Sequence, residues 1–284
     1  MKIRFLLLFL LLGFSVIGLE WPMIPATLFN NFGANDSGTP HLGLSFENDG
    51  AIASTDHGEI LFIHSEGEKA SRLASPLGTW VAVDHGEGLI GVYSRSGESD
   101  VPVKNTVEAG TVLGVSGRSG WSNRQGFHFS LYDRKERHWV NPAMLLPPAP
   151  DSRPPVIQSV QLRNEDGLMV NPTLTRRIPQ GMYSILVTIT DLIDQNENPL
   201  APQSISCFVN GAEIGFLHFE IFSVRDGTVM AYRSTPVPAE LVYTNAPAFE
   251  AEKIWLTSGQ TTIEVVAQDL QGRSRSAIFT IVVD

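Results

Sequence analysis

Five prolines fall within ten residues near the middle of this chain, at positions 147, 148, 150, 154 and 155. Proline lacks a backbone N–H and fixes φ, so this stretch can continue neither a helix nor a central strand. Residues 147–155 are therefore predicted to be a stiff, extended linker. With 284 residues in total, the chain has room for a domain on each side, at residues 19–146 and 156–284.

Short apolar runs bounded by glycine, aspartate and serine fill the first block. No long helical periodicity interrupts them, and runs of this length between turn residues are typical of antiparallel strands. The first block is therefore predicted to be an antiparallel all-β domain. The clearest strand candidates are residues 58–63, 80–83, 89–93, 112–115 and 127–131.

The second block shows longer alternating runs, which also predict strands. Asp269 to Arg273 supplies a turn between the last two runs, as in a β-hairpin. The strand spacing and this hairpin resemble bacterial immunoglobulin-like modules, so an immunoglobulin-like β-sandwich is expected. Cys207, the only cysteine, alternates with apolar neighbours and is interpreted as a buried hydrophobe, which excludes an intramolecular disulfide.

The N-terminus has the pattern of an export signal. Lys2 and Arg4 precede an apolar run that weakens towards Gly18, so residues 1–18 are predicted to be a signal peptide. The run is short for a membrane span, although an uncleaved anchor remains an alternative. The mature protein is expected in the periplasm or cell envelope, and not as an integral membrane protein.

Acidic residues outnumber basic ones by 30 to 20, giving a formal net charge of −10. Such a surface repels phosphate backbones, so nucleic acid is not an expected partner.

A series of short motifs follows one order through the first block, and its most informative member is Gln125-Gly126-Phe127-His128-Phe129-Ser130. A strand places residues i and i+2 on one face, so a His-x-His pair here would aim two imidazoles into one cleft. Gly126 stands where the first imidazole would be. The other motifs lie at residues 32–33, 41–45, 53–60, 83–88, 93–96, 107–114, 117–120 and 140–142.

Taken in this order, residues 32–146 resemble the lysostaphin-type (LytM-like) zinc endopeptidases, which cleave peptide cross-links in peptidoglycan. The resemblance implies a LytM-like antiparallel β-sheet domain. It also implies a zinc ion held by two histidines and an aspartate, with two further histidines acting on the zinc-bound water. Carried over position by position, the ligands would be His41, Ser45 and His128, and the helper histidines would be Arg95 and Gly126.

Three of these five positions hold residues of the wrong chemistry. A neutral serine hydroxyl is a poor zinc ligand beside a carboxylate. Arg95 keeps its proton near neutral pH and adds positive charge, and Gly126 has no side chain. No catalytic residue is therefore assigned, and zinc is expected only if His41 and His128 retain it. The five residues would line the former substrate groove.

Substitute ligands were sought among nearby residues. Glu47 would reach inward only after a shift of strand register. His57, His64 and His85 are interpreted as surface or turn histidines. Trp121, in the loop before the last motif strand, suits either packing or stacking on a glycan.

The leading hypothesis is an exported, catalytically degenerate member of this family that binds cell-wall peptide or regulates a cell-wall hydrolase. Arg95 would pair with a peptide carboxylate. One alternative is an active zinc endopeptidase with a rearranged metal site, and another is a structural envelope protein.

Overall fold

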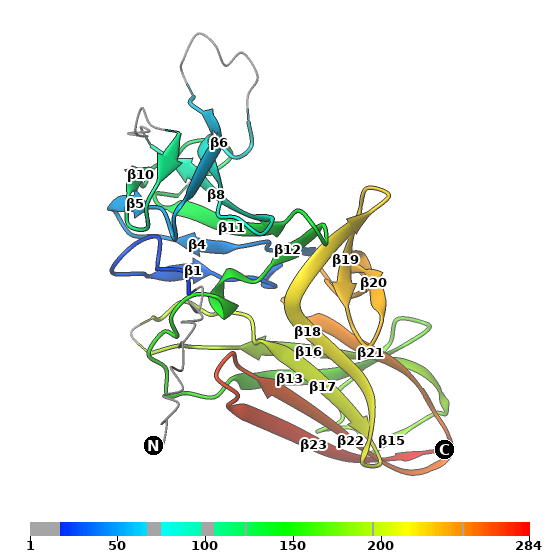
Figure 1. The fold of residues 1–284 in the computed structure, drawn as a ribbon. Coiled ribbons are helices and arrows are strands. Elements are labelled where there is room, and N and C mark those ends of the chain that lie inside the picture. Colours follow the sequence, from blue (N-terminus) through cyan, green and yellow to red (C-terminus); the bar gives the residue numbers. More distant parts are fainter. Residues whose placement is uncertain (1–17, 67–74, 98–104, 123, 195, 246) are drawn as a thin grey trace, which may run out of the picture.

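The computed structural model describes residues 18–66, 75–97, 105–122, 124–194, 196–245 and 247–284. Of the predicted signal peptide, only Gly18 lies within these residues. The described chain is nearly all β, as predicted from its short alternating runs (Figure 1). Among the described residues, no helix has the length and apolarity needed to cross a bilayer.

The first half of the chain folds into a strongly twisted antiparallel sheet with the order β12-β11-β8-β7-β6-β9, and β4 joins β11 to β1. Phe127, Phe129 and Leu131 of β11 pack in the hydrophobic core of this half, as expected, and His128 and Ser130 on the opposite face are buried as well. The strands and the 3-10 turn of this half are β1 (Leu28–Asn30), β2 (Asn35–Asp36), β3 (Thr39–Pro40), β4 (Leu44–Phe46), β5 (Ala51–Ala53), β6 (Gly58–His64), β7 (Thr79–Asp84), β8 (Leu89–Ser96), β9 (Thr106–Val107), β10 (Val112–Val115), β11 (Phe127–Asp133), β12 (His138–Val140) and η1 (Pro142–Met144).

The second half forms two facing sheets, β14-β13-β16-β21 and β15-β23-β22-β17-β18. Ile263, Val265 and Ala267 are fully buried on alternate positions of β22, so this strand lines the core between the sheets. The sandwich was predicted, whereas its assignment to the immunoglobulin-like class stays a prediction. Its elements are β13 (Val156–Asn164), β14 (Met169–Val170), β15 (Arg177–Ile178), β16 (Gly181–Thr190), β17 (Ser204–Val209), β18 (Ala212–Arg225), β19 (Thr228–Tyr232), β20 (Pro236–Pro238), η2 (Ala239–Leu241), β21 (Phe249–Leu256), β22 (Gly259–Gln268) and β23 (Ser274–Val283).

Cys207 lies in β17 and is 1% exposed, which confirms the expected buried thiol. Burial raises the pKa of this thiol to about 12, and the charge of Glu252 adds to the effect. The thiol therefore stays protonated and packs as an apolar group.

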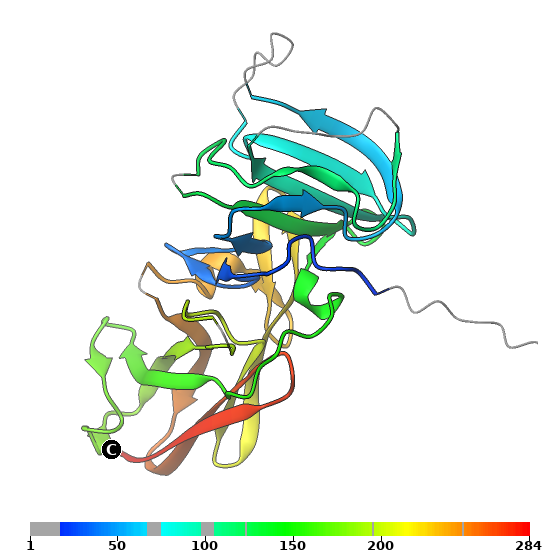
Figure 2. The same cartoon turned by 90° about the vertical axis from the view of Figure 1, so that its left-hand side faces the viewer.

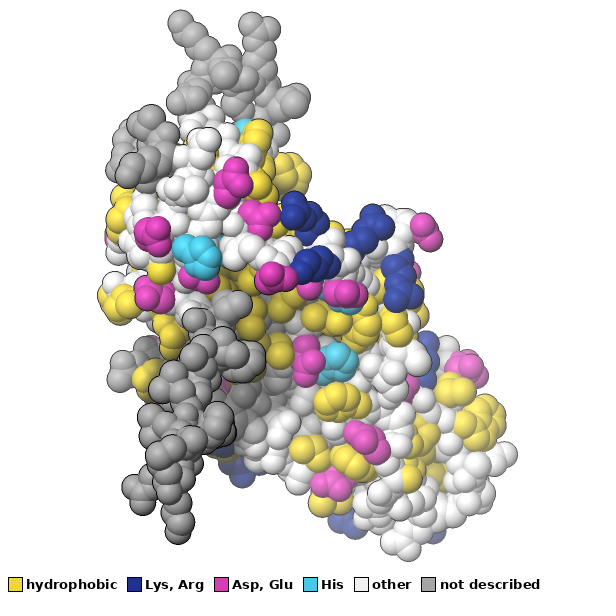
Figure 3. Space-filling view, viewed as in Figure 1, with side chains coloured by type: hydrophobic (Ala, Val, Ile, Leu, Met, Phe, Trp, Pro, Cys, Tyr) yellow, Lys and Arg dark blue, Asp and Glu magenta, His cyan; other side chains and the backbone are white. Residues whose placement is uncertain are grey.

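One hydrogen-bonded sheet runs through both halves, because β12 of the first pairs with β18 of the second. Trp139 lies opposite Phe222, and Val140 lies opposite Ile221. Figures 1 and 2 show the long strand β18 rising from the sandwich to the first half. Figure 3 shows hydrophobic side chains where the two halves meet. The two blocks on either side of the linker are therefore joined directly by strand pairing.

Each hydrophobic core also includes residues from the other half of the chain. Phe32 and Ala34 belong to the core of the sandwich, and Leu200 belongs to the core of the first half. Gly33 lets the backbone approach the sandwich closely, since a Cβ there would lie 2.6 Å from the side chain of Phe219. Each half therefore needs the other to complete its packing.

The proline-rich segment is extended but bound to its surroundings. The indole of Trp21 donates to the carbonyl of Pro147 at 3.0 Å. Arg273 of the β22–β23 hairpin bonds to the backbone carbonyl of Asp151 at 2.7 Å and to its carboxylate. The linker is thus held on the sandwich by side chains that periodicity does not reveal.

Candidate functional site

Three neighbouring strands bring the predicted site residues together. In the register of β4, β11 and β8, His128 lies opposite Ser45 on one side and opposite Ser94 on the other. His41 precedes β4 in the chain, and Arg95 follows Ser94 near the end of β8. Sequence positions far apart therefore meet at one place because the strands pair in this order.

His41, Ser45 and His128 form a compact hydrogen-bonded cluster. The Ser45 hydroxyl lies 2.9 Å from His41 Nε2 and 3.0 Å from His128 Nδ1. The two rings meet edge to face with centroids 4.9 Å apart. Because the hydroxyl has one proton, it can donate to at most one ring and accepts an N–H from at least one of them. The three residues therefore satisfy one another.

The cluster is shielded from water. The exposed fractions are 7% for His41, 1% for Ser45 and 9% for His128. A serine beside a histidine resembles a nucleophile beside its base. However, the buried Ser45 hydroxyl has no open path to a substrate carbonyl.

Burial and charge keep both imidazoles neutral. Burial lowers the pKa of His41 to about 4, and the positive charge of Arg95 adds to the effect. The pKa of His128 is also well below its ordinary value, because of burial first and then the charges of His41 and Arg95. Near neutral pH, the only full charge of the five site positions is the Arg95 guanidinium.

Arg95 lies close to the cluster with a guanidinium that is only partly satisfied. Its φ of +63° is unusual for a side chain of this size. Its Nε is buried without a hydrogen-bond partner, and among the described residues no carboxylate lies within 4.0 Å of its nitrogens. Burial lowers its pKa, and the negative charge of Asp36 opposes this. This cation is therefore available to an anionic group from outside.

Gly126 occupies a backbone conformation that excludes a side chain. Its φ is +143°, and it forms an isolated bridge with Gly117 through hydrogen bonds of 2.8 and 3.0 Å. A Cβ at this position would fall deep inside the van der Waals contact distance of the Phe46 carbonyl oxygen. The histidine that the resemblance implies here therefore has no room on this backbone.

The residues present do not fit the zinc ion that the resemblance implies. A catalytic zinc site has three protein ligands and an open position. Here the two imidazoles are joined by a neutral hydroxyl that already bonds to both. Among the described residues, no Asp, Glu or Cys joins His41 and His128 in a three-ligand group. The nearby charge of Arg95 opposes a further cation.

Glu47 does not supply a replacement carboxylate. Its Oε1 accepts a hydrogen bond from Asn198 Nδ2 at 2.8 Å, and its backbone N–H bonds to the Thr27 carbonyl. The side chain thus points to the second half of the molecule. The register shift that would have turned it inward is absent, because Ser45 faces His128 directly.

His85 lies in the β7–β8 turn, as one alternative of the prediction had it, but the surface alternative is wrong. His85 is 8% exposed, and its ring lies between the His57 carbonyl, at 2.9 Å from Nδ1, and the Tyr93 hydroxyl, at 3.2 Å from Nε2. Tyr93 in turn bonds to Thr55 at 2.8 Å. This buried network ties the β7–β8 turn to the loop after β5, so His85 has a structural role.

The remaining candidates lie apart from the cluster. His57 is exposed and contacts Asp56, as expected for a turn residue. His64 bonds to the Gly78 carbonyl at 2.8 Å. Trp121 is 82% exposed, which rules out the packing role and leaves its ring free for a ligand or partner.

The sequence did not single out a second group of ionisable residues. Asp151, Asp191 and Asp269 come together where the linker meets the sandwich. They belong to no common motif and lie far apart in the chain. Only the turn signal at Asp269 marked any of them in advance.

Acidification from pH 7.5 to 5 is expected to destabilise the protein by about 2 kcal/mol through His41 alone. The ordinary pKa of histidine, 6.5, applies to the unfolded chain, whereas the folded value is about 4. Stability from neutral His41 is therefore fully present above pH 6.5 and is lost as the pH falls towards 4. Urea unfolding at the two pH values measures the change. His41→Gln should show a smaller pH dependence, and an equal one would contradict the assignment.

Comparison with known proteins identifies the first half of the chain. The family model for peptidase family M23 matches residues 39–142, so these residues form an M23 (LytM-like) domain. A second domain follows, and a family model without a description matches residues 154–284. Among the curated proteins compared with it, none is similar to this chain.

Solved structures with local similarity include three M23 peptidases. The catalytic domain of the prophage-encoded M23 protein EnpA from Enterococcus faecalis is 20% identical, with 45% of this chain and 96% of that chain covered and a TM-score of 0.37. A peptidase M23 from Pseudomonas aeruginosa is 27% identical, covering 41% of this chain and 46% of that chain, with a TM-score of 0.34. The catalytic domain of lysostaphin from Staphylococcus simulans is 21% identical, covering 38% and 77%, with a TM-score of 0.30.

Proposed function

We propose that this protein is exported and acts in the cell envelope without peptidase activity, as a binding protein for peptidoglycan peptides. The observation that supports this most strongly is the closed His41–Ser45–His128 cluster. It occupies the position where an active M23 domain would hold zinc. The backbone at Gly126 leaves no room for a third imidazole. The export signal over residues 1–18 remains part of the proposal.

Arg95 is the residue proposed to contact the peptide. Peptidoglycan peptides carry carboxylates, and a guanidinium pairs with a carboxylate through two parallel hydrogen bonds. Arg95 is half-buried, its Nε has no partner, and the neighbouring histidines are neutral. These conditions strengthen an ion pair because little water competes for it.

Replacing Arg95 by glutamine is expected to weaken binding of a soluble peptidoglycan peptide about tenfold or more, as loss of a partly buried charged hydrogen bond does. Isothermal titration measures the affinity. Arg118→Gln is the matched control, because Arg118 is exposed in the loop near the site, and its affinity should stay within about twofold. Equal affinities for wild type and Arg95→Gln would overturn the role of Arg95.

Metal analysis tests the absence of peptidase activity. The purified protein without residues 1–18 is expected to retain less than about 0.1 zinc per chain after dialysis and to produce no lysis of peptidoglycan, because a catalytic zinc needs three protein ligands. One tightly bound zinc per chain together with lytic activity would establish the rearranged zinc endopeptidase instead.

Regulation of a cell-wall hydrolase is a second candidate, favoured by an exposed strand. In the described residues, β9 pairs only with Gly58 and Glu59 of β6. Leu61, Phe62 and Ile63 beyond them are 46%, 51% and 42% exposed. Apolar strands of this kind attract protein partners. Loss of hydrolase activation in Phe62→Asp, with peptide binding unchanged, would favour this candidate.

A further inference from the structure

Three aspartates converge where the linker, the end of β16 and the β22–β23 hairpin meet. One carboxylate oxygen from each of Asp151, Asp191 and Asp269 lies within 4.8 Å of the other two. Asp191 and Asp269 are only 6% and 3% exposed. Like charges held this closely in a buried place repel one another unless a cation or a proton lies among them.

Arg273 neutralises part of this charge through direct bonds to Asp269 and Asp151. Its Nε donates to Asp269 Oδ2 at 2.9 Å, and its terminal nitrogens bond to the backbone carbonyl and carboxylate of Asp151. Backbone N–H groups of Gln271 and Arg273 also donate to Asp269 Oδ1. When all three carboxylates are ionised, as they would be around a bound cation, the three carboxylates and one guanidinium carry a net charge of −2.

Asp191 presents an unsatisfied acceptor to the cluster. Its Oδ1 is buried and has no hydrogen-bond partner among the described residues. An isolated buried carboxylate oxygen is costly, and native proteins normally satisfy it. Burial raises the pKa of Asp191 to about 7, and the charges of Asp269 and Asp151 contribute further. The positive charge of Arg273 opposes this rise but does not cancel it.

A small cavity opens beside the same three residues. Its volume is about 70 Å³, and its lining includes Asp151, Asp191, Asp269 and the amide side chains of Gln203 and Gln271. Since one water needs a cavity of only about 10–15 Å³ on this measure, the space admits water molecules beside an ion. The cavity thus provides room for the water ligands that would complete the coordination of an ion.

We propose that Asp151, Asp191 and Asp269 bind one divalent cation with hard oxygen ligands, with Ca²⁺ preferred to Mg²⁺. Ca²⁺ takes six to eight oxygen ligands at about 2.3–2.6 Å in flexible geometry, so three carboxylate oxygens that lie within 4.8 Å of one another can share one ion. Mg²⁺ keeps several of its waters and usually binds only one or two carboxylates, so a group of three carboxylates favours Ca²⁺. A divalent ion also neutralises the net charge of −2.

Bound Ca²⁺ fastens three segments of the chain at once. Asp151 belongs to the linker, Asp191 bridges to Leu200 through backbone bonds of 2.8 and 2.9 Å, and Asp269 begins the last hairpin. Leu200 packs in the core of the M23 half. The ion therefore stabilises the connection between the two domains, and this role is independent of what the His41 cluster binds.

Thermal unfolding and isothermal titration of the intact protein with CaCl₂, after removal of metal with EGTA, test the proposal. Wild type is expected to bind one Ca²⁺ per chain, and its Tm should rise by about 5 °C at a hundredfold excess over Kd. MgCl₂ should bind at least tenfold more weakly. Asp191→Asn keeps the shape of the side chain but removes its charge, so Ca²⁺ binding should be lost.

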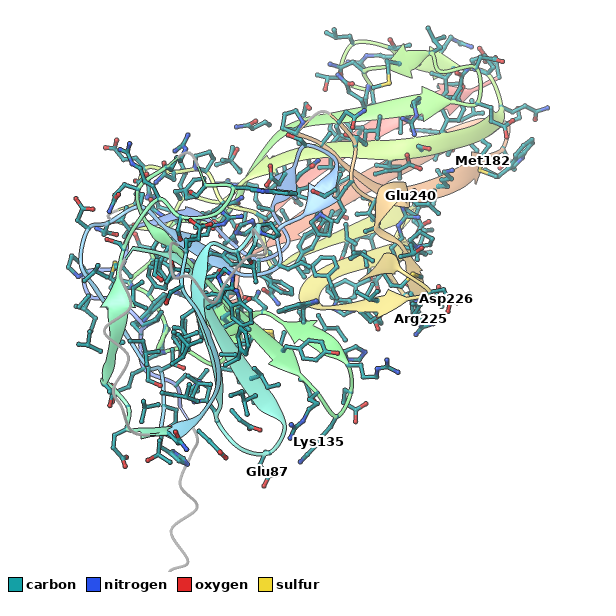
Figure 4. The ribbon with its side chains drawn as sticks, turned by 90° about the horizontal axis from the view of Figure 1, so that it is seen from above. Glu87, Lys135, Met182, Arg225, Asp226 and Glu240 are labelled. Carbon is teal, nitrogen blue, oxygen red and sulfur yellow. The ribbon has the colours of Figure 1, made fainter. Side chains whose placement is uncertain are left out.

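Asp226→Asn is the matched control, because Asp226 is exposed at the tip of the β18–β19 hairpin, beside Arg225 and away from the cluster (Figure 4). It should bind Ca²⁺ as wild type does. If Asp191→Asn fails to fold, as judged by circular dichroism, Asp151→Asn replaces it, since Asp151 lies in the linker outside every strand. No binding by wild type, or equal binding by a folded cluster variant, would overturn the proposal. Equal affinities for Ca²⁺ and Mg²⁺ would overturn the preference.

Discussion

Gly126→Ala is expected to lower the free energy of unfolding by about 3 kcal/mol or more, because two penalties combine at this position. The φ of +143° disfavours any side chain, and the new Cβ would collide with the Phe46 carbonyl oxygen. That carbonyl belongs to backbone, so it cannot rotate away as a side chain does. Urea unfolding measures the loss.

Gly259→Ala is the control that measures the cost of the backbone strain alone, without a steric collision. Gly259 has a similar φ of +129°, but no atom lies within 4 Å of its would-be Cβ. Its replacement should cost only the strain, about 1–2 kcal/mol. Equal losses in the two variants would show that the Phe46 carbonyl gives way. In that case the triple variant Ser45→Asp, Arg95→His and Gly126→His would become a route to an active zinc site. If the Phe46 carbonyl instead stays in place, we expect this triple variant to remain inactive.

Phe222→Ala is expected to destabilise both halves together by about 3–5 kcal/mol, as the loss of a fully buried aromatic ring does. Phe222 is 0% exposed, and its ring packs on Phe32 from the first half, with centroids 5.1 Å apart. It also lies opposite Trp139 in the β12–β18 pairing. A single unfolding transition shifted to lower denaturant, seen by both circular dichroism and tryptophan fluorescence, is the expected observation.

Phe216→Ala provides the comparison, because Phe216 lies in the same strand but is 37% exposed. Its loss should cost less than about 1.5 kcal/mol. If wild type shows two separate unfolding transitions and Phe222→Ala shifts only one of them, the two halves do not fold as one unit.

The strands were predictable because each carries its own local signal. Alternation in β11 and β22 marks the buried face without knowledge of the partner strand. The pairing of β12 with β18 carries no such signal, since it joins segments far apart in the chain. The proline content correctly predicted that the linker is extended. It could not predict which residues the linker contacts. The bonds of Arg273 to Asp151 come from a hairpin that composition cannot connect to the linker.

The positions of the site residues were predictable from motif order, but their surroundings were not. The sequence places His41, Ser45 and His128 at matching positions, and strand register then brings them within hydrogen-bond distance. His85 shows the limit, because a motif gives a position in the chain and no information on burial. The strain at Gly126 likewise depends on the Phe46 carbonyl, which belongs to a different strand.

The unbroken sheet through β12 and β18 fixes the angle between the two domains. Any contact that fixes the orientation of the sandwich therefore also fixes the direction in which Arg95 faces. In the proposed binding role, only peptides that approach from that direction would reach Arg95. The orientation of the sandwich and the orientation of the site around Arg95 are thus set by one structural feature, the β12–β18 pairing.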